Sequence, residues 1–172
     1  MADRSRILTS LERERTALVA RYRAFDPDVL DTPCTRSEDP DGRDWTPRDH
    51  LAHLLRIEVA FLGMARATLD GDRDPLKIPG SSWEQRLVAV HRANEEHVDE
   101  LGGLPLDELL DRLELARRDT LVFIAGLNDE QLDVPIPGAP WGDGSIGSVL
   151  RTNAYHERQH VQWVDEGLAG RR

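Results

Sequence analysis

The chain has 172 residues, with 22 Lys and Arg against 32 Asp and Glu, and therefore a formal net charge of −10 at pH 7. A chain of this length fits one domain, residues 1–172, and can bury about 70% of the surface that its unfolded form exposes. The negative charge repels phosphate groups, so nucleic acid and anionic membrane surfaces are disfavoured as partners.

The N-terminal part of the chain is predicted to form one amphipathic helix followed by a long loop. Residues 1–10 lack the apolar core of a signal peptide, which favours a cytoplasmic protein. Between residues 4 and 25, apolar side chains recur at spacings of three and four, as on one face of a helix. Residues 26–45 contain three prolines and many acids, which is typical of a loop. Cys34, in this loop, is the single cysteine, so an internal disulfide is excluded.

The second predicted helix has the clearest start in the sequence. Thr46 is a good N-cap, Pro47 suits the first helical position, and Asp49 places an anion in the first turn, where the helix dipole favours it. The helix is expected to end near Asp70. Histidines and charged residues interrupt its apolar stretch, residues 51–69, which excludes a membrane span.

Three further helices are predicted, over residues 83–101, 106–127 and 145–168, each with an apolar stripe at helical spacing. Residues 128–144 are rich in proline and glycine and are expected to form a second long loop. No segment shows the alternation that is typical of a strand. The pattern therefore predicts an all-α, up-and-down helical bundle with long Pro/Gly-rich loops.

Histidines on two of these helices are predicted to point into the bundle. His156 and His160 share the inward face of the last helix with Asn153, because residues three and four apart lie on one side. His53 lies on the inward face of the second helix, with His50 at the edge of that face. Catalytic Zn²⁺ sites typically take three protein ligands and keep one position open, so three converging histidines are the minimum set. The alternative is that they are hydrogen-bonded core residues.

His156 to His160 also fits the H-E-x-x-H pattern of metalloproteases, but the rest of that site is missing. Only twelve residues follow His160, and none of them is the third histidine ligand that such enzymes carry downstream. A peptidase is therefore disfavoured. Glu157 is a candidate general base beside the metal, and the alternative is an ordinary surface residue.

Two other features are assigned no chemistry. Gly142 to Gly147 fits G-x-G-x-x-G, but a dinucleotide fingerprint must follow a strand, and here a proline-rich loop precedes it. This run is predicted to be a loop that leads to an N-cap at Ser145. His91 and His97 fall on different faces of one helix and are expected to be structural or exposed.

The run W-T-P-R-D-H-L-A-H-L from Trp45 to Leu54, followed by Glu58, resembles the second-helix signature of the DinB-like, or YfiT-like, superfamily of metal-dependent enzymes. In that signature the second histidine binds the metal, and His53 occupies its place. The superfamily's C-terminal H-x-x-x-H signature is similar to His156–His160. Residues 104–133 also resemble the helix and loop that precede its last helix, so the resemblance covers nearly the whole chain.

This resemblance implies a four-helix core with an additional shorter helix, a divalent metal such as Zn²⁺ or Ni²⁺, and often a homodimer. Members of the superfamily include transferases of low-molecular-weight thiols, a mycothiol-dependent maleylpyruvate isomerase and a hydrolase that acts on a toxic natural product. His50 departs from the signature, because an inward histidine three residues before His53 can compete for the metal or support a ligand by hydrogen bonding. Asn153 is expected to play one of the same two roles.

We therefore predict a cytoplasmic metal-dependent enzyme with a small-molecule substrate and with His53, His156 and His160 as metal ligands. Metal coordination deprotonates a thiol, so the expected chemistry is S-transfer or isomerisation with a thiol such as mycothiol as co-substrate. Two alternatives stay open: a hydrolase that uses metal-bound hydroxide at the same site, and a metal-free bundle that binds or sequesters a small molecule. A purely structural homodimer is a further alternative, because the second helix has another apolar edge, formed by Leu51, Leu55, Leu62 and Leu69.

Overall fold

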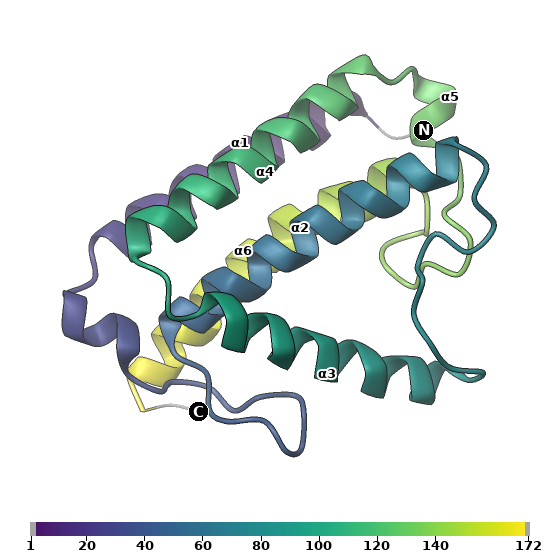
Figure 1. The fold of residues 1–172 in the computed structure, drawn as a ribbon. Helices are drawn as coiled ribbons and strands as arrows, with labels where there is room; N and C mark the ends of the chain where they lie inside the picture. The colour runs from purple at the N-terminus through teal and green to yellow at the C-terminus, as the bar shows by residue number, and fades with distance from the viewer. Residues whose placement is uncertain (1–2, 171–172) are drawn as a thin grey trace.

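The computed structural model describes residues 3–170 as a bundle of long helices (Figure 1). In chain order the elements are α1 Arg4–Arg23, the 3-10 helix η1 Pro27–Asp31, α2 Pro47–Leu69, α3 Trp83–Leu101, α4 Leu106–Gly126, α5 Asp129–Leu132 and α6 Ile146–Leu168. Within residues 3–170 the structure contains no strand, and β-type pairing is limited to isolated bridges between Thr35 and Trp45 and between Pro135 and Ser145. The predicted all-α class is confirmed.

Four helices, α1, α2, α4 and α6, form the core of the bundle. Helix α1 packs against α6 and α4, and α2 packs against the same two helices from the other side. Helix α3 contacts α2 and diverges from the other long helices, as Figure 1 shows. The predicted four-helix bundle with one additional helix is therefore confirmed, and α3 is the addition.

The ends of the two helices that carry the histidines follow from their capping residues. The Thr46 side chain accepts a hydrogen bond from the Asp49 backbone N–H, and the Asp49 carboxylate accepts one from the Thr46 backbone N–H at 2.8 Å. This reciprocal capping box satisfies N–H groups that the first turn leaves without partners. At the start of α6, the Ser145 side chain accepts from the Ser148 backbone N–H. Both predicted N-caps are confirmed.

Other predicted boundaries need correction. The first helix ends at Arg23 rather than residue 25, and α4 ends at Gly126 because Leu127 adopts an extended backbone conformation. The predicted loop at 128–144 contains a short helix, α5, which starts with a capping box between Asn128 and Gln131. A four-residue helix is too short to produce a visible apolar stripe, so the sequence gives little sign of it.

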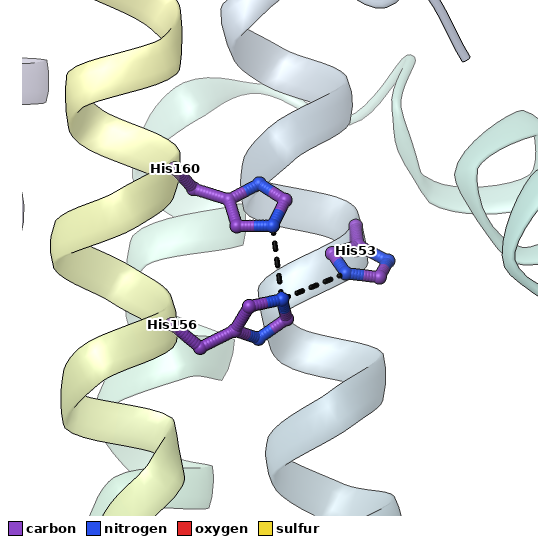
Figure 2. Close-up of side chains that lie close together, drawn as sticks. All are labelled: His53, His156 and His160. Carbon is purple, nitrogen blue, oxygen red and sulfur yellow. Dashed lines mark hydrogen bonds between the residues drawn. The ribbon is translucent and has the colours of Figure 1, made fainter. Parts of the chain in front are cut away.

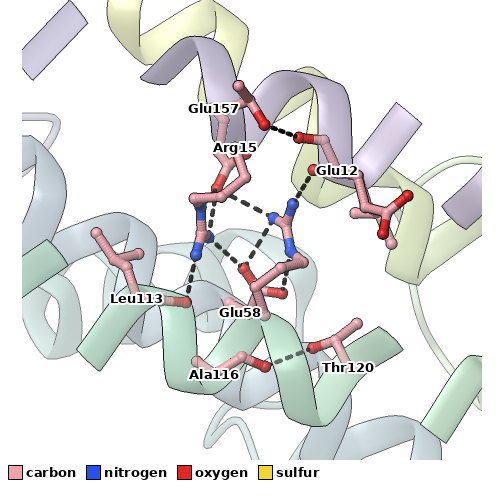
Figure 3. Close-up of polar contacts among 10 residues, drawn as sticks. Glu12, Arg15, Glu58, Leu113, Ala116, Thr120 and Glu157 are labelled. Atoms are coloured by element: carbon pink, nitrogen blue, oxygen red, sulfur yellow. Dashed lines mark hydrogen bonds and ion pairs between the residues drawn. The ribbon is translucent and has the colours of Figure 1, made fainter. Parts of the chain in front are cut away.

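The hydrophobic core consists of two clusters with buried charge between them. One cluster includes Leu18 and Leu113, and the other includes Leu11, Phe61 and Ile124. Between them each core helix contributes one charged residue, and we call this set the charged layer: Arg15 on α1, Glu58 on α2, Arg117 on α4 and Glu157 on α6. Each of these residues is at most 3% exposed. Figure 3 shows Arg15 with the carboxylates of Glu58 and Glu157.

The leucine edge on α2 is covered by the chain itself. Leu51, Leu55 and Leu62 are buried within the single chain, and Leu69, the last residue of the predicted edge, is half-buried. The buried part of this edge therefore packs against helices of the same chain. Across the described residues, no helix has both the length and the apolar character that a membrane crossing requires.

Candidate metal centre

Three histidines from α2 and α6 lie together where these two helices pack against each other (Figure 2). His53 comes from α2, and His156 and His160 come from α6, one turn apart. His53 and His160 are buried and His156 is half-buried. Because His156 and His160 are four residues apart on α6, both of their imidazoles lie on the side that faces α2. We call His53, His156 and His160 the histidine cluster.

The nitrogen atoms of the histidine cluster converge at distances that suit a shared ion. His156 Nε2 lies 3.3 Å from His53 Nε2 and 2.9 Å from His160 Nε2. Each residue offers one ligand atom, and these atoms all lie within 4.8 Å of one another. Nitrogens bound to tetrahedral Zn²⁺ at 2.0 to 2.1 Å are about 3.4 Å apart. The donor set and its spacing therefore fit a divalent metal.

Burial keeps two of these imidazoles, His53 and His156, in the neutral form. Burial lowers the pKa of His156 to about 4. Burial also lowers the pKa of His53 well below its ordinary value, and the neighbouring His156 and His50 lower it further. A neutral imidazole has a free lone pair, which is the form that binds a metal. At neutral pH, His53 and His156 therefore need no deprotonation before an ion binds.

His50 forms a hydrogen bond with His160 that orients the His160 ring. His50 Nδ1 lies 2.6 Å from His160 Nδ1, and His50 Nε2 lies 2.8 Å from the Thr35 Oγ1. Binding of an ion through His160 Nε2 requires the proton on Nδ1, which then donates to His50 Nδ1, and His50 in turn donates from Nε2 to Thr35. Such partners hold a ligand in the correct tautomer. Of the two roles predicted for His50, this geometry supports the hydrogen-bonding one.

The loop before α2 brings Thr35 and Trp45 to the site. The Cys34 backbone N–H donates to the Trp45 carbonyl at 2.8 Å, and the Trp45 N–H donates to the Thr35 carbonyl at 2.7 Å. The Trp45 ring lies against His53, with ring centroids 5.1 Å apart, and its Nε1–H donates to Glu95 on α3 at 2.8 Å. The sequence offered no sign of these roles, because they depend on a backbone bridge within a loop.

Cys34 does not supply a reactive thiolate to this centre. The side chain is 9% exposed, and its thiol donates to the Trp45 carbonyl oxygen at 3.4 Å. Burial, together with the charge of Asp49, raises the pKa of the thiol to about 12. A thiol with that pKa stays protonated and unreactive at neutral pH. Any thiol chemistry here must use a thiol that enters from outside.

Glu157 is buried in the charged layer rather than exposed on the surface of α6. Its carboxylate accepts hydrogen bonds from Arg15 and Arg117 in the charged layer and is 2% exposed. Burial raises the pKa of Glu157 despite these two cations. The expectation of a surface residue is wrong, because the residue after His156 turns by about 100° toward α1 and α4. The general-base role of Glu157 stays a prediction. The H-E-x-x-H pattern thus contains a histidine pair on one side of the helix and a buried charge on another.

The remaining candidates are placed as follows. Asn153 is 3% exposed, and its Nδ2 has no hydrogen-bond partner within residues 3–170. Its link to the metal stays a prediction.

His91 Nε2 lies 3.1 Å from Glu38 Oε2. His97 is partly exposed and lies 3.8 Å from Glu100, as expected of a residue without a role at the site. Gly142 and Gly144 have positive φ angles in the loop before Ser145, which confirms the loop interpretation of G-x-G-x-x-G.

Two cavities of different character meet at the histidine cluster. One, of about 310 Å³, is lined by His53, His156 and His160 together with mostly polar residues of the 35–45 loop and α6. The other, of about 180 Å³, reaches His53 and His156 from the side of α3 and is lined mainly by apolar and aromatic residues. His91 lines this second cavity, and its helical position alone did not reveal that. The centre is therefore open to small molecules from two sides.

Fold and site together define a class of protein: a four-helix bundle with an added helix and a three-histidine cluster between its second and last long helices. The chain belongs to the DinB superfamily, whose family model matches residues 10–164. A comparison with curated proteins gives no match.

Solved structures support the same fold. The chain is similar to the crystal structure of an uncharacterised protein from Escherichia coli UTI89, with a TM-score of 0.72, 14% identity, and coverage of 99% of this chain and 95% of that chain. It is also similar to a protein from Streptococcus pneumoniae, with a TM-score of 0.66, 15% identity, and coverage of 96% and 90%. At these identities the likeness shows the fold alone.

Proposed function

We propose that this protein is a metal-dependent enzyme in which His53, His156 and His160 bind a divalent ion such as Zn²⁺ or Ni²⁺. Its reaction is the attack of a low-molecular-weight thiol, such as mycothiol, on an electrophilic small molecule, with S-transfer or isomerisation as the outcome. The observation that carries the proposal is the convergence of three Nε2 atoms, 3.3 and 2.9 Å apart, in a largely buried group that two cavities reach.

The protein side chains have distinct roles in this proposal. When bound, the ion supplies the positive charge that lowers the pKa of a thiol and stabilises its thiolate. His50 holds the His160 ring so that Nε2 faces the other histidines. Trp45 covers His53 and limits the access of water on that side. Thr35, Arg36 and Gln159 line the polar cavity, where they can hydrogen-bond the polar groups of a thiol.

Metal analysis tests the first half of the proposal. The protein is purified without a histidine tag, loaded with Zn²⁺ or Ni²⁺, and freed of excess metal. We expect about one equivalent of bound metal, as for one three-histidine site. His160→Ala should lose it while retaining the helical circular dichroism spectrum. The matched control is His97→Ala, on α3, which should keep it. Full retention of metal by His160→Ala would contradict the ligand assignment.

An activity assay tests the second half. Metal-loaded protein is incubated with an electrophile in the presence and absence of a small thiol. Turnover that requires the thiol and is lost in His160→Ala supports S-transfer. Turnover that is indifferent to the thiol would instead identify a hydrolase at the same centre. Binding of a small molecule by protein that takes up no metal would favour the metal-free binding bundle.

The proposal includes a cytoplasmic location and a homodimer. A single cysteine, held as a buried thiol, suits a reducing compartment. Because the leucine edge of α2 is already covered, a dimer must use another surface. The outer face of α4 exposes Leu115 and Val122, which are 56% and 70% exposed. Sedimentation of the wild type and of Val122→Ser shows whether each is a monomer or a dimer. A monomeric wild type would exclude the dimer.

A further inference from the structure

The two cavities at the histidine cluster differ in chemistry, although they share part of their walls. Both are lined by Glu38, His53 and His156. Beyond these shared residues, the cavity of about 310 Å³ has polar side chains such as Thr35 and Gln159. The histidine cluster therefore lies at the boundary between a polar and an apolar compartment.

The apolar cavity is an extended space rather than a shallow hollow. Ile57 and Phe61 on α2 line it on one side, Val90 on α3 lines it opposite, and Trp141 from the loop before α6 also contributes to its wall. The same four residues also line a further cavity of about 290 Å³, which continues along α2 and α3 away from the histidines. The Phe61 and Trp141 rings lie 4.7 Å apart between centroids and form an aromatic wall common to both spaces.

The lining of this continued space limits what it binds. Met64, Leu76 and Ile78 extend the apolar surface beyond Phe61. Two cations, Arg56 and Lys77, also line the far cavity, and Lys77 pairs with Asp72 at 2.7 Å. A hydrocarbon or aromatic body gains free energy on entering such a space, whereas a strongly hydrated molecule loses hydrogen bonds to water there.

We propose that the electrophilic substrate has a largely hydrocarbon body that lies between α2 and α3, with its reactive end at His53 and His156 and the polar thiol on the opposite side. This inference rests on the proposed function, because it assigns the two reactants of that reaction to the two cavities. It gives the substrate class: an elongated apolar electrophile, with an alkyl chain or an aromatic ring system. The shared walls bring the two reactants together only at the histidines.

Binding of unreactive analogues tests this inference without any turnover. N-methyl-, N-butyl- and N-hexylsuccinimide share one polar head that lacks a conjugated double bond to accept a thiol, and they differ only in alkyl length. Isothermal titration calorimetry with Zn²⁺-loaded protein should give a Kd that falls about three- to fourfold for each added methylene group. An equal Kd for all three compounds would overturn the inference.

Variants locate the binding site within the fold. Ala60 lines the far cavity from α2, so Ala60→Leu should fill it and weaken N-hexylsuccinimide binding by about tenfold or more. N-methylsuccinimide binding should not change. Ala93→Leu, which fills the same cavity from α3, is the second variant should Ala60→Leu fail to fold. The control is Ala125→Leu on the exposed face of α4. Unchanged N-hexylsuccinimide affinity in a folded cavity-filling variant would overturn the inference.

Metal content measured on the same samples separates this inference from the proposed function. Protein that binds Zn²⁺ but shows no dependence on chain length overturns the apolar-substrate inference alone. Protein that shows this dependence but binds no metal overturns the three-histidine proposal alone, while it supports the apolar binding space.

Discussion

The histidine cluster and the charged layer are two buried polar groups built on the same pair of helices. Glu58 follows His53 by five residues on α2, and Glu157 follows His156 directly on α6. The histidines face α3 and the loop before α2, whereas the glutamates face α1 and α4. On each of these two helices, a histidine and a nearby glutamate therefore face different sides of the molecule.

The difference between the two groups lies in how they are neutralised. In the charged layer, two guanidinium groups meet two carboxylates, with Arg117 Nε 2.7 Å from Glu58 Oε1 and Arg15 Nε 2.7 Å from Glu157 Oε1. Each arginine also donates to a backbone carbonyl, at Leu113 or Leu11. Burial alone would raise the pKa of Glu58, but the charge of Arg117 lowers it below the ordinary value. Each charged side chain of this layer therefore pairs with an oppositely charged one.

The histidine cluster is built from like groups rather than from ion pairs. Three imidazole nitrogens point at one another, cavities reach them from two sides, and burial favours the neutral form of His53 and His156. Converging lone pairs need a cation or shared protons between them. The charged layer is therefore held by ion pairs within the chain, whereas the histidine cluster is the site that we propose for a metal ion.

The largest expected effect comes from breaking the charged layer. Arg117→Met leaves Glu58 and Glu157 buried with one cation between them, and we expect the free energy of unfolding to fall by about 3–5 kcal/mol. Chemical denaturation followed by circular dichroism measures it. Arg118→Met, at the exposed neighbouring position on α4, is the control and should change little. A loss below about 1 kcal/mol would show that the layer is not the structural element described.

Removing the support of His160 should affect metal binding more than folding. His50→Phe deletes the hydrogen-bond partner of His160 Nδ1, and we expect Zn²⁺ affinity to fall by about 10- to 100-fold. Competition with a chromophoric chelator measures the Kd. His97→Phe should leave it unchanged. If His50→Phe abolished binding as completely as His160→Ala, His50 would be a ligand itself, and the cluster would need redefinition.

Asp49 tests how much the capping box at the start of α2 stabilises the fold. Burial alone would raise the pKa of Asp49, but hydrogen bonds from Arg43 and Thr46 hold it below the ordinary value of 3.8. A carboxyl with a lowered folded-state pKa stabilises the fold above its unfolded-state pKa, and this contribution is lost as pH falls through the folded-state value. We expect Asp49→Asn to lose about 1–2 kcal/mol at pH 7.

The difference between Asp49→Asn and the wild type should disappear as pH falls below 3.8. Denaturation curves over a pH series measure it, with Asp44→Asn, at an exposed position, as the control. A difference that stayed constant with pH would mean that the charge of Asp49 does not stabilise the cap.

The smallest expected effect concerns the outermost partner of the histidines. Thr35→Val keeps the shape of the side chain but removes the acceptor for His50 Nε2. We expect a stability loss of about 1 kcal/mol, the usual net value of one buried hydrogen bond. The effect on Zn²⁺ affinity should be smaller than that of His50→Phe. A larger effect from Thr35→Val would reverse the order of influence along this chain of contacts.

Sequence reasoning found the helices and the inward histidines because both depend on local periodicity. Thr46 and Ser145 were identifiable as caps, since a cap is a contact between residues three apart. The position of Glu157 was not identifiable. Its neighbours Arg15 and Arg117 are 142 and 40 residues away, and a lone glutamate on a helix looks the same whether it faces water or a buried guanidinium.

The sequence by itself determined the all-α class, the starts of α2 and α6 and the inward faces that carry His53, His156 and His160, because 3.6-residue periodicity and capping are properties of short segments. The tertiary structure alone decided that these three nitrogens meet, that His50 lies between His160 and Thr35, and that Glu157 belongs to the core. Those outcomes depend on how α6 is rotated against α2 and α1. That rotation is set by packing between residues more than a hundred positions apart.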